Sequence, residues 1–401
     1  MRLPSFTNRS VIAGLLVAGS FAAPAAVAWP GTSPAKVADE AGVLGGNVSG
    51  LAAGEDGSLW AVRDDPGSLL LLDRVAPNGT WRPREGWGSG RSLRYPDGHG
   101  GPDAEAVTRA ASDAAAVYVG AERDNSVAQT SRNSVLRFEP GRTGPLTATR
   151  EWNLTSLLPA TNANAGIEGL AWVPDSVLVA AKFRDSNGRA YVPATLPAHG
   201  DGVFVVALEQ NGGLYLTALH DDGGATLLAT VSTGQRSVME AVWVADRGEL
   251  WAACDNACDG EITALTFDGG ELVVASSIKS PRGSEDLNNE GLAVFGCAAD
   301  AALVVWSDDS VDDGHALRES TIACRQVAPG PVTTSAQPGT SGSPSTTSRV
   351  GASSAPPSIV VENQGESSAS GVLVAVAVVL GVAAAGGAVG ALVVVARRRQ
   401  P

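Results

Sequence analysis

Residues 167–170 read IEGL, and this short motif recurs along the chain with small changes. The matching segments are VSGL at 48–51, AEAV at 104–107, MEAV at 239–242 and NEGL at 289–292. Each motif is followed by a second apolar run that ends in an aspartate, at Asp64, Asp124, Asp185, Asp255 and Asp308. One or two further β-rich runs follow each pair of segments. A four-stranded unit that repeats in this way predicts a β-propeller, in which the units surround a central axis.

The repeats predict an all-β propeller of five four-stranded blades, or of six if one blade has lost its motif. Short apolar runs separated by Gly, Asp, Asn and Pro support the all-β class, because these residues favour turns between strands. In the third repeat, the second strand is predicted over residues 177–185. The last repeat offers about three strands, so we expect residues 36–46 to supply the missing strand and close the ring.

The N-terminal segment has the layout of a secretory signal peptide. Arg2 and Arg9 precede an uncharged apolar run over residues 11–28, which ends in the small-residue pattern Ala26-Val27-Ala28. This pattern predicts cleavage before Trp29, and therefore a signal peptide over residues 1–28. An uncleaved N-terminal anchor is the alternative.

The C-terminal segment predicts a membrane anchor. Residues 371–396 carry no charge, and about 20 apolar residues are enough for a helix to cross a bilayer. Arginines follow at 397–399, so the positive-inside rule places the 397–401 tail in the cytoplasm. Residues 325–370 are rich in Pro, Ser, Thr and Gly, which predicts an unfolded stalk. The propeller is then an extracellular domain over residues 29–324, held at the cell membrane by one span.

The four cysteines, Cys254, Cys258, Cys297 and Cys324, all lie in the part predicted to be exported. An oxidising exterior favours disulfides at these positions. Three pairings are open, of which 254–258 together with 297–324 is the most local. A zinc site is the competing interpretation, but the chain has no C-x-x-C spacing.

The composition excludes some classes of function. The formal net charge is −14, and the arginines at the two ends hide part of the acidity of the remaining chain. An acidic domain argues against nucleic-acid binding, because that requires basic groups to neutralise phosphates. It favours solubility or cation binding instead. The sequence also lacks a G-x-S-x-G nucleophile motif and any paired histidine spacing typical of metal ligands.

Glutamates lead the first strand of four repeats, at Glu105, Glu168, Glu240 and Glu290, whereas Ser49 replaces the acid in the first repeat. The first strands of a propeller line its channel, so we expect these carboxylates to converge near one mouth. A cation, arginines or raised pKa values must then offset their repulsion. Oxygen ligands of this kind suit Ca²⁺. In the alternative, each glutamate accepts hydrogen bonds from neighbouring backbone amides as a structural clasp.

Other charged residues are expected near the same mouth. Asp308 and Asp309 belong to the densest acidic cluster and are the next candidates for Ca²⁺, although EF-hand spacing is absent. Arg123, Lys182 and Arg184 lie close to repeat aspartates and predict a mouth of mixed charge, able to hold a metal and an anionic substrate. For the repeat aspartates, turn formation at strand ends is the simpler interpretation.

The segments DAEAV at 103–107, YVGAERD at 118–124 and VLRF at 135–138 resemble the phytase-like propeller family, also described as esterase-like activity of phytase. The resemblance covers most of residues 45–323. It implies a propeller and, by analogy with β-propeller phytases, Ca²⁺-assisted phosphomonoester hydrolysis, with Ca²⁺ bridging substrate phosphates and polarising an attacking water. The four glutamates would match acidic positions, and the three basic residues would contact phosphate. Ser49, the repeat count of five and the few basic residues depart from the family pattern.

Two functions remain open from the sequence. The first is a Ca²⁺-assisted phosphoesterase at the cell surface, favoured by the carboxylate ring and its basic neighbours. The second is a non-catalytic surface propeller that binds a ligand or partner, favoured by the absence of a nucleophile motif. A sugar-lactone hydrolase of a related propeller type would also need a metal in the channel.

Overall fold

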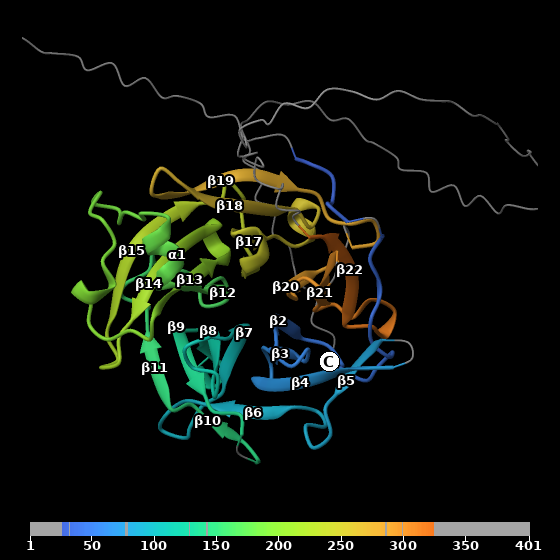
Figure 1. The fold of residues 1–401 in the computed structure, drawn as a ribbon. Coiled ribbons are helices and arrows are strands. Elements are labelled where there is room, and N and C mark those ends of the chain that lie inside the picture. The colour runs from blue at the N-terminus through green and yellow to red at the C-terminus, as the bar shows by residue number, and fades with distance from the viewer. Residues whose placement is uncertain are drawn as a thin grey trace, which may run out of the picture. The chain divides into compact units, whose positions relative to one another are not determined.

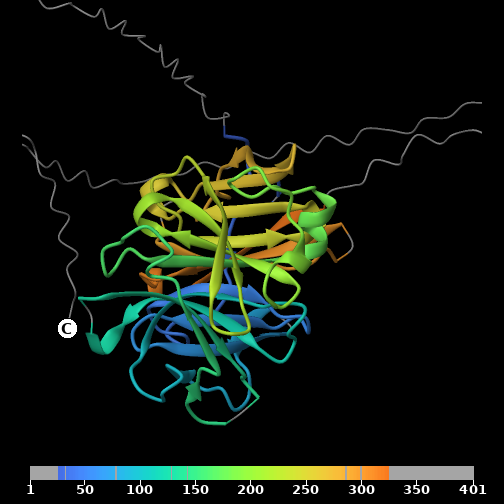
Figure 2. The ribbon, with the colours of Figure 1, turned by 90° about the vertical axis from the view of Figure 1, so that its left-hand side faces the viewer.

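The computed structural model describes residues 26–324 of the 401-residue chain, except 32, 77, 78, 128, 142, 285, 286 and 299. In this part the chain forms five β-sheets that surround one axis as the blades of a propeller (Figure 1). Figure 2 shows the blades from the side. The prediction of an all-β, five-bladed propeller is confirmed, which decides against six blades.

Blade 1 has more strands than the others. Its sheet runs in the order β2–β3–β4–β6–β10, and β5 also pairs with β4. The bounds are β2 (Val48–Ala53), β3 (Leu59–Arg63), β4 (Ser68–Val75), β5 (Thr80–Pro83), β6 (Arg91–Arg94) and β10 (Leu146–Thr147). Strand β10 follows the third strand of the next repeat and pairs in parallel with β6, so it joins blades 1 and 2 at their outer edge.

Blades 2, 3 and 4 each have four antiparallel strands. Blade 2 contains β7 (Pro102–Thr108), β8 (Val117–Asp124), β9 (Ser131–Phe138) and β11 (Arg150–Asn153). Blade 3 contains β12 (Ile167–Pro174), β13 (Gly202–Leu208), β14 (Gly213–Leu219) and β15 (Ala225–Ser232). Blade 4 contains β16 (Glu240–Val244), β17 (Glu249–Ala253), β18 (Ile262–Asp268) and β19 (Glu271–Ile278). The recurring motifs begin the innermost strands, as predicted.

Blade 5 closes the ring with a strand from the other end of the domain. It contains β20 (Asn289–Val294), β21 (Ala301–Asp308), β22 (Leu317–Ala323) and β1 (Lys36–Val37), and β1 pairs antiparallel with β22. Just after β1, the buried carboxylate of Asp39 accepts the backbone N–H of Ala316 at 2.9 Å and contacts His315 at 3.3 Å. The predicted closure by residues from 36 onward is confirmed.

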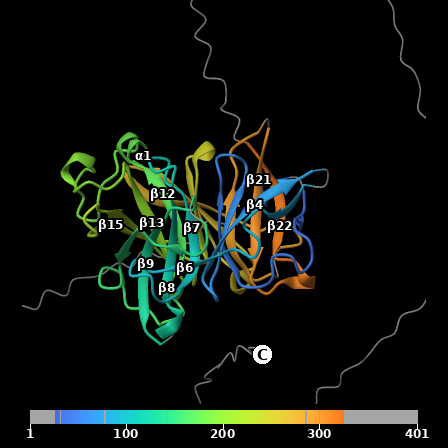
Figure 3. The same ribbon diagram turned by 90° about the horizontal axis from the view of Figure 1, so that it is seen from below.

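One strand prediction is wrong. Residues 177–185 do not form the second strand of blade 3, because Asp175–Ala180 is a short helix, α1, at the end of β12 (Figure 3). The second strand is β13, which begins only at Gly202. An apolar run of four residues fits either a strand or a helix, and here the acidic Asp175 after Pro174 provides a helix start. The other helical segments are single 3-10 turns: η1 (Asn125–Val127), η2 (Pro193–Thr195), η3 (Glu209–Asn211), η4 (Ala245–Arg247), η5 (Asn256–Cys258) and η6 (Asp312–Gly314).

Small residues in the recurring motif allow the inner strands to approach the axis. A Cβ atom added to Gly50 would lie 2.5 Å from the Cα of Ala106 in the next blade. One added to Gly169 would lie 2.5 Å from the backbone nitrogen of Ala241. Both distances are far below van der Waals contact, so the third motif position requires glycine or, where space allows, alanine. Bulky side chains instead fill the space between blades, where Trp251 and Trp306 pack together in one core cluster.

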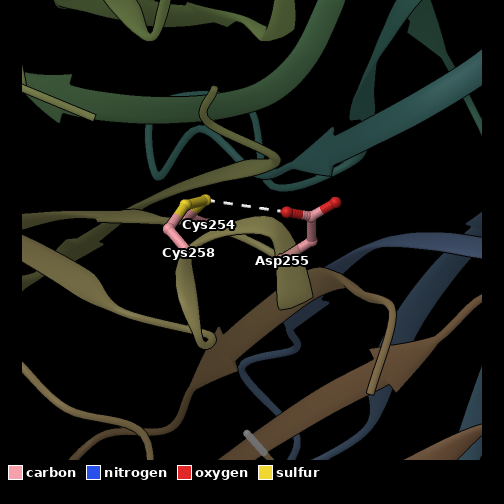
Figure 4. Close-up of side chains that lie close together, drawn as sticks. All are labelled: Cys254, Asp255 and Cys258. Carbon is pink, nitrogen blue, oxygen red and sulfur yellow. Dashed lines mark hydrogen bonds between the residues drawn. A yellow bond between two sulfur atoms is a disulfide. The ribbon is translucent and has the colours of Figure 1, made fainter. Parts of the chain in front are cut away.

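The two disulfides join Cys254 to Cys258 and Cys297 to Cys324. This is the most local of the three pairings, which confirms disulfides over a zinc site. The first closes the loop after β17, beside Asp255 (Figure 4). Asp255 also caps the turn by accepting the N–H of Ala257. The second fixes the last described residue to the connection between β20 and β21.

The predicted signal peptide, stalk, membrane span and tail lie largely outside the described residues, which include only 26–28 of the signal peptide. There, Val27 pairs with β19 through backbone hydrogen bonds to Ser277 and Lys279. Across residues 26–324, with the gaps given above, no helix is long and apolar enough to span a bilayer.

The closure of blade 5 predicts a stability effect. Replacing Asp39 by alanine leaves the buried N–H of Ala316 without its acceptor, so the free energy of unfolding should fall by about 1–3 kcal/mol. Lys36→Ala is the matched control, because the Lys36 ammonium is exposed and Arg74 remains to pair with Glu319, so the loss should be less than about 1 kcal/mol. Urea unfolding of the full-length chain measures both. Equal effects of the two variants would show that Asp39 does not hold the closure.

Candidate functional site

Five carboxylates from blades 1, 2 and 3 meet where the inner strands begin. They form two sets, Asp64 with Asp103 and Glu105, and Glu105 with Glu122 and Glu168. Within each set, one carboxylate oxygen of every residue lies within 4.8 Å of the others. Glu105 belongs to both sets and links them. We refer to these five residues as the carboxylate cluster.

Irregular strands bring the cluster together. Asp103 and Glu105 are two residues apart on β7, a spacing that places side chains on the same face of a regular strand. The register of β7 against β8 shifts on both sides of Ala104, and that of β8 against β9 shifts between Ala121 and Arg123. Such β-bulges redirect side chains locally. Glu122 therefore reaches the same space as Glu105, although the alternation along β8 would not predict it.

Several oxygens of the cluster form no hydrogen bond of good geometry, although Arg123 lies beside two of them. Asp103 and Glu122 are fully buried, yet neither oxygen of Asp103 and only one of Glu122 has a hydrogen bond of good geometry. The satisfied Glu122 oxygen accepts the N–H of Gly166 at 2.9 Å. Among the described residues, no hydrogen bond reaches the carboxylate of Glu105 or Glu168 either. Buried polar atoms are nearly always satisfied in folded proteins, so these oxygens indicate a missing partner.

The cluster carries more negative charge than its surroundings neutralise. In the described part of the chain, Arg123 is the cationic side chain that forms ion pairs in the cluster, with Asp103 and with Glu122. Burial raises the pKa of Asp103 to about 6 and that of Glu122 to about 8. Burial and then repulsion from neighbouring carboxylates raise the pKa of Glu105 and Glu168 well above the usual range. Protons or a cation must therefore compensate the cluster near neutral pH.

The donor set suits Ca²⁺. Each set offers only oxygen ligands, and Ca²⁺ takes six to eight oxygens from carboxylates, carbonyls and water. Asp103 and Glu122 provide buried oxygens that form no hydrogen bond of good geometry and that share one guanidinium, that of Arg123. Asp64 adds a half-buried carboxylate whose pKa is also raised by burial. The residues present therefore fit a divalent cation of this type.

Glu240 has a different environment, although it occupies the same motif position. Its buried carboxylate accepts backbone N–H groups from Ala241 at 2.9 Å and from Leu51 and Leu170 at 3.2 Å each. The N–H of Leu292 is a further donor. These four amides belong to four different inner strands: β16, β2, β12 and β20. Burial raises the pKa of Glu240, and the four amides oppose this shift. Glu240 therefore matches the backbone-clasp alternative, not the metal-ligand prediction.

A cavity of about 220 Å³ lies on the other side of this clasp. The side chains of Leu51, Leu170 and Leu292, whose amides bind Glu240, line it together with Trp172 and Trp243. The lining is mostly apolar. The axis of the propeller thus has an acidic side and an apolar side, and Glu240 lies between them.

The remaining predicted acidic residues lie outside the two carboxylate sets. Glu290 accepts hydrogen bonds from Ser49 at 3.2 Å and Asn288 at 3.0 Å, and it is near enough to raise the pKa of Glu105. Asp308 accepts the N–H groups of Ser310 and Asp312, so it closes the turn after β21. Asp309 lies beside Asn288 at 3.4 Å. In blade 1, Ser49 occupies the motif position that a glutamate has in the other blades. Its hydroxyl donates a hydrogen bond to Glu290, the motif glutamate of blade 5.

The three predicted substrate contacts do not lie together. Arg123 is at the cluster, where its guanidinium is buried against Asp103 and Glu122 and contacts the carbonyl of Ala163. Lys182 and Arg184 follow α1, beyond the far end of β12, and the N–H of Arg184 binds the carbonyl of Gly270 in the β18–β19 turn. They are therefore on the opposite face of the propeller. The wrong strand assignment for residues 177–185 accounts for this misplacement.

Sequence reasoning missed three acidic residues at the site. Asp103 could have been predicted from the sequence, because it is two residues from Glu105 and residues at that spacing lie on the same face of a strand. Glu122 is placed by a bulge that no sequence pattern marks. Glu209, directly after β13, occupies the position in blade 3 that was assigned to Asp185, and its charge contributes to the raised pKa of Glu168.

The contrast between Glu240 and Glu168 predicts opposite effects of the same substitution. Glu240→Gln replaces an accepting oxygen with an N–H₂ group that faces backbone donors, so the free energy of unfolding should fall by about 1–3 kcal/mol. Glu168→Gln removes a repelling charge that has no backbone donor, so the metal-free stability should stay constant or rise. Calcium affinity should fall at least tenfold for Glu168→Gln and change little for Glu240→Gln. Urea unfolding with chelator and calorimetric Ca²⁺ titration measure the two effects.

The raised pKa values predict how stability depends on pH. Without metal, the folded state keeps protons on Glu122 and Asp103 that the unfolded state releases near pH 4. The two protonated carboxyl groups contribute their full stabilisation below about pH 4. This contribution is lost as the pH rises through the folded-state pKa values, about 6 for Asp103 and about 8 for Glu122. The melting temperature in chelator should therefore fall from pH 5 to pH 8. Added Ca²⁺ should remove most of this fall, and an equal fall with and without Ca²⁺ would contradict a metal at the cluster.

Comparison with known proteins places the domain in a family. Residues 44–310 match the family named Phytase-like, described as esterase-like activity of phytase. No curated protein matches the chain. Among solved structures, the PQQ-bound form of aldose sugar dehydrogenase from Streptomyces coelicolor is 15% identical, and the match covers 75% of this chain and 100% of that chain. Its TM-score of 0.36 is too low to support an argument about function. The family match covers well over half of the chain and the propeller has the expected architecture, so the chain belongs to the phytase-like family.

Proposed function

We propose that the protein is a Ca²⁺-dependent phosphoesterase that acts at the carboxylate cluster. One observation carries the proposal: five carboxylates, of which Asp103 and Glu122 are fully buried, share a single buried guanidinium at a point where three blades meet. A fold does not usually retain uncompensated buried charge, which costs several kcal/mol per group. A divalent cation is the partner that these oxygens suit, and membership of the phytase-like family supports phosphoester hydrolysis as the reaction.

The two carboxylate sets would hold metal in adjoining positions. Asp64 and Asp103 would contribute to one position, Glu122 and Glu168 to the other, and Glu105 to both. When bound, Ca²⁺ would supply positive charge to bind a substrate phosphate and to polarise an attacking water. The protein itself places few cations there, so the site should bind phosphate poorly until metal neutralises the carboxylates.

The role of Arg123 in this proposal is to position Asp103. Its guanidinium is buried and paired with Asp103, and its own carbonyl accepts the hydroxyl of Tyr95 at 2.9 Å. These contacts fix the side chain, so it holds one carboxylate of the cluster in place. In this proposal the bound metal, and not Arg123, contacts the substrate phosphate.

We also propose that the protein acts outside the cell and is held at the membrane. The support is in the sequence, namely the signal peptide predicted over 1–28, the apolar segment 371–396 and the arginines that follow it. Disulfides in the propeller agree with an oxidising compartment. Extracellular Ca²⁺ concentrations are high enough to fill sites of modest affinity.

A second candidate is a non-catalytic propeller that binds a ligand or partner and uses Ca²⁺ only for stability. The specific observation in its favour is the pairing of Arg123 with cluster carboxylates, which leaves it unable to reach toward a substrate. Both candidates require metal at the cluster. They differ in whether phosphate ester is turned over there.

The deciding experiment is a phosphatase assay on the full-length chain, with p-nitrophenyl phosphate and inositol hexakisphosphate as substrates. We expect Ca²⁺-dependent release of phosphate that chelator abolishes. Glu105→Gln should lower the rate at least tenfold, because it removes the carboxylate common to both sets. Glu271→Gln is the matched control: this exposed residue begins β19, outside the cluster, and the variant should retain full activity.

Two results would separate the candidates. Tight Ca²⁺ binding without turnover of either substrate would leave the binding propeller. Turnover that is indifferent to both Ca²⁺ and Glu105→Gln would show that neither candidate describes the cluster.

A further inference from the structure

Acidic side chains continue beyond the carboxylate cluster into blades 3 and 5. Glu209 directly follows β13, and its backbone N–H binds the carbonyl of Gly166 at 3.0 Å, two residues before Glu168. Besides burial, the charge of Glu209 contributes to the raised pKa of Glu168. In the same way, the charge of Glu290 in blade 5 contributes, after burial, to the raised pKa of Glu105. Two further carboxylates therefore flank the five of the cluster.

The arginines beside the cluster in the described chain already have partners. Arg123 forms ion pairs with two carboxylates of the cluster itself. The guanidinium of Arg132 binds both carboxylate oxygens of Glu151, at 2.9 and 2.7 Å. That of Arg63 donates to two backbone carbonyls. A substrate anion would have to displace one of these contacts to reach a guanidinium group.

The opposite face of the domain has a different balance of charge. A cavity of about 390 Å³ lies there between blades 2 and 3, next to the β7–β8 connection. Two arginines line this cavity, and each has an aspartate partner. Arg137 pairs with Asp113 at 2.6 Å, and Arg150 pairs with Asp221 at 3.5 Å. The excess of acid at the cluster is therefore not repeated in this cavity.

The cluster would keep negative charge even with metal bound. The two proposed metal positions would bring four positive charges as Ca²⁺, and Arg123 adds one. Seven carboxylates face them, namely the five of the cluster, Glu209 and Glu290. Carboxylates that bind metal do so in the deprotonated form. A phosphate dianion increases the excess of negative charge, so a positive charge elsewhere on the substrate is favoured.

The surroundings of the cluster favour a primary ammonium group over a quaternary one. A primary ammonium donates three hydrogen bonds, and the cluster offers carboxylate oxygens as acceptors. A quaternary ammonium instead binds the open face of an aromatic ring. Tyr95, whose hydroxyl binds the carbonyl of Arg123, is the aromatic residue next to the cluster in the described chain. Its ring is already covered by the guanidinium of Arg132, 3.6 Å from the centroid.

We propose that the site prefers the phosphate monoester of a primary amino alcohol. This inference rests on the proposed function, because it takes the carboxylate cluster as the metal-dependent site for the phosphate. Glu209 is the acceptor that we assign to the ammonium group, since it is half-buried beside the cluster and belongs to neither carboxylate set. Alcohols that carry a carboxylate or further phosphate groups are disfavoured by the same excess of negative charge.

Three unreactive phosphonates of matched size test the preference, by calorimetric titration of the full-length chain with saturating Ca²⁺. They are 3-aminopropylphosphonate, butylphosphonate and 3-phosphonopropionate, which differ in the charge of the end away from the phosphonate. We expect the amino compound to bind about tenfold more tightly than the butyl compound, and the carboxylate to bind about tenfold less tightly. Chelator should weaken the binding of all three, because the phosphonate then meets uncompensated carboxylates.

A pair of glutamate variants locates the preference. Glu209→Gln removes one negative charge and keeps the size of the side chain. The ratio of amino to butyl affinity should fall about fivefold in this variant. Glu271→Gln is the matched control, because Glu271 is exposed at the start of β19, outside the cluster, and the ratio should keep its original value.

Each outcome supports or overturns the inference. The expected order of affinities, with a smaller ratio in Glu209→Gln alone, supports it. Equal affinities, a reversed order, no binding of any phosphonate, or equal effects of the two variants would overturn it. Hydrolysis of 2-aminoethyl phosphate and propyl phosphate is measured separately. The expected order of binding without hydrolysis would contradict the phosphoesterase and support the charge preference, whereas hydrolysis with equal affinities would do the reverse.

Discussion

The hydrogen bonds of Glu240 tie the inner strands of the propeller to one another. Its single carboxylate accepts N–H groups from four inner strands, and these strands come from blades 1, 3, 4 and 5. Each inner strand pairs with one strand of its own blade and leaves its other edge facing the axis, where its N–H groups need acceptors. A carboxylate with several acceptor positions solves this problem at one point. The small residues of the motif are required for the same reason, since a side chain at Gly169 would push the amide of Ala241 away.

The two faces of the domain deal with charge in different ways. At the carboxylate cluster, five acids share one buried arginine, so the imbalance must be met by protons or by an added cation. At the cavity between blades 2 and 3, each arginine of the rim has its own aspartate. The first arrangement leaves net negative charge that favours a cationic ligand, whereas the charged groups of the second are balanced within the protein. The distinction follows from local pairing and could not be inferred from the net charge of −14.

The sequence was most informative where the repeat imposes the same constraint on every blade. The recurring motif located all five inner strands, and the incomplete last repeat indicated the closing strand β1. It was least informative where a blade departs from the repeat. The apolar residues 177–180 fit a strand as well as a helix, and this error also placed Lys182 and Arg184 on the wrong face. At the site, Glu105 and Glu168 were predicted to converge, but Glu122 was not, because a β-bulge in β8 determines its direction. The motif alone could not separate Glu240 from the others, since the difference lies in which backbone amides surround each carboxylate.

The position of Glu240 also separates two ends of the inner strands that have different linings. Its carboxylate accepts amides of four inner strands, and the leucines that carry three of those amides line the apolar cavity beyond. No residue of the carboxylate cluster lines that cavity. A substitution in either lining therefore leaves the residues of the other unchanged.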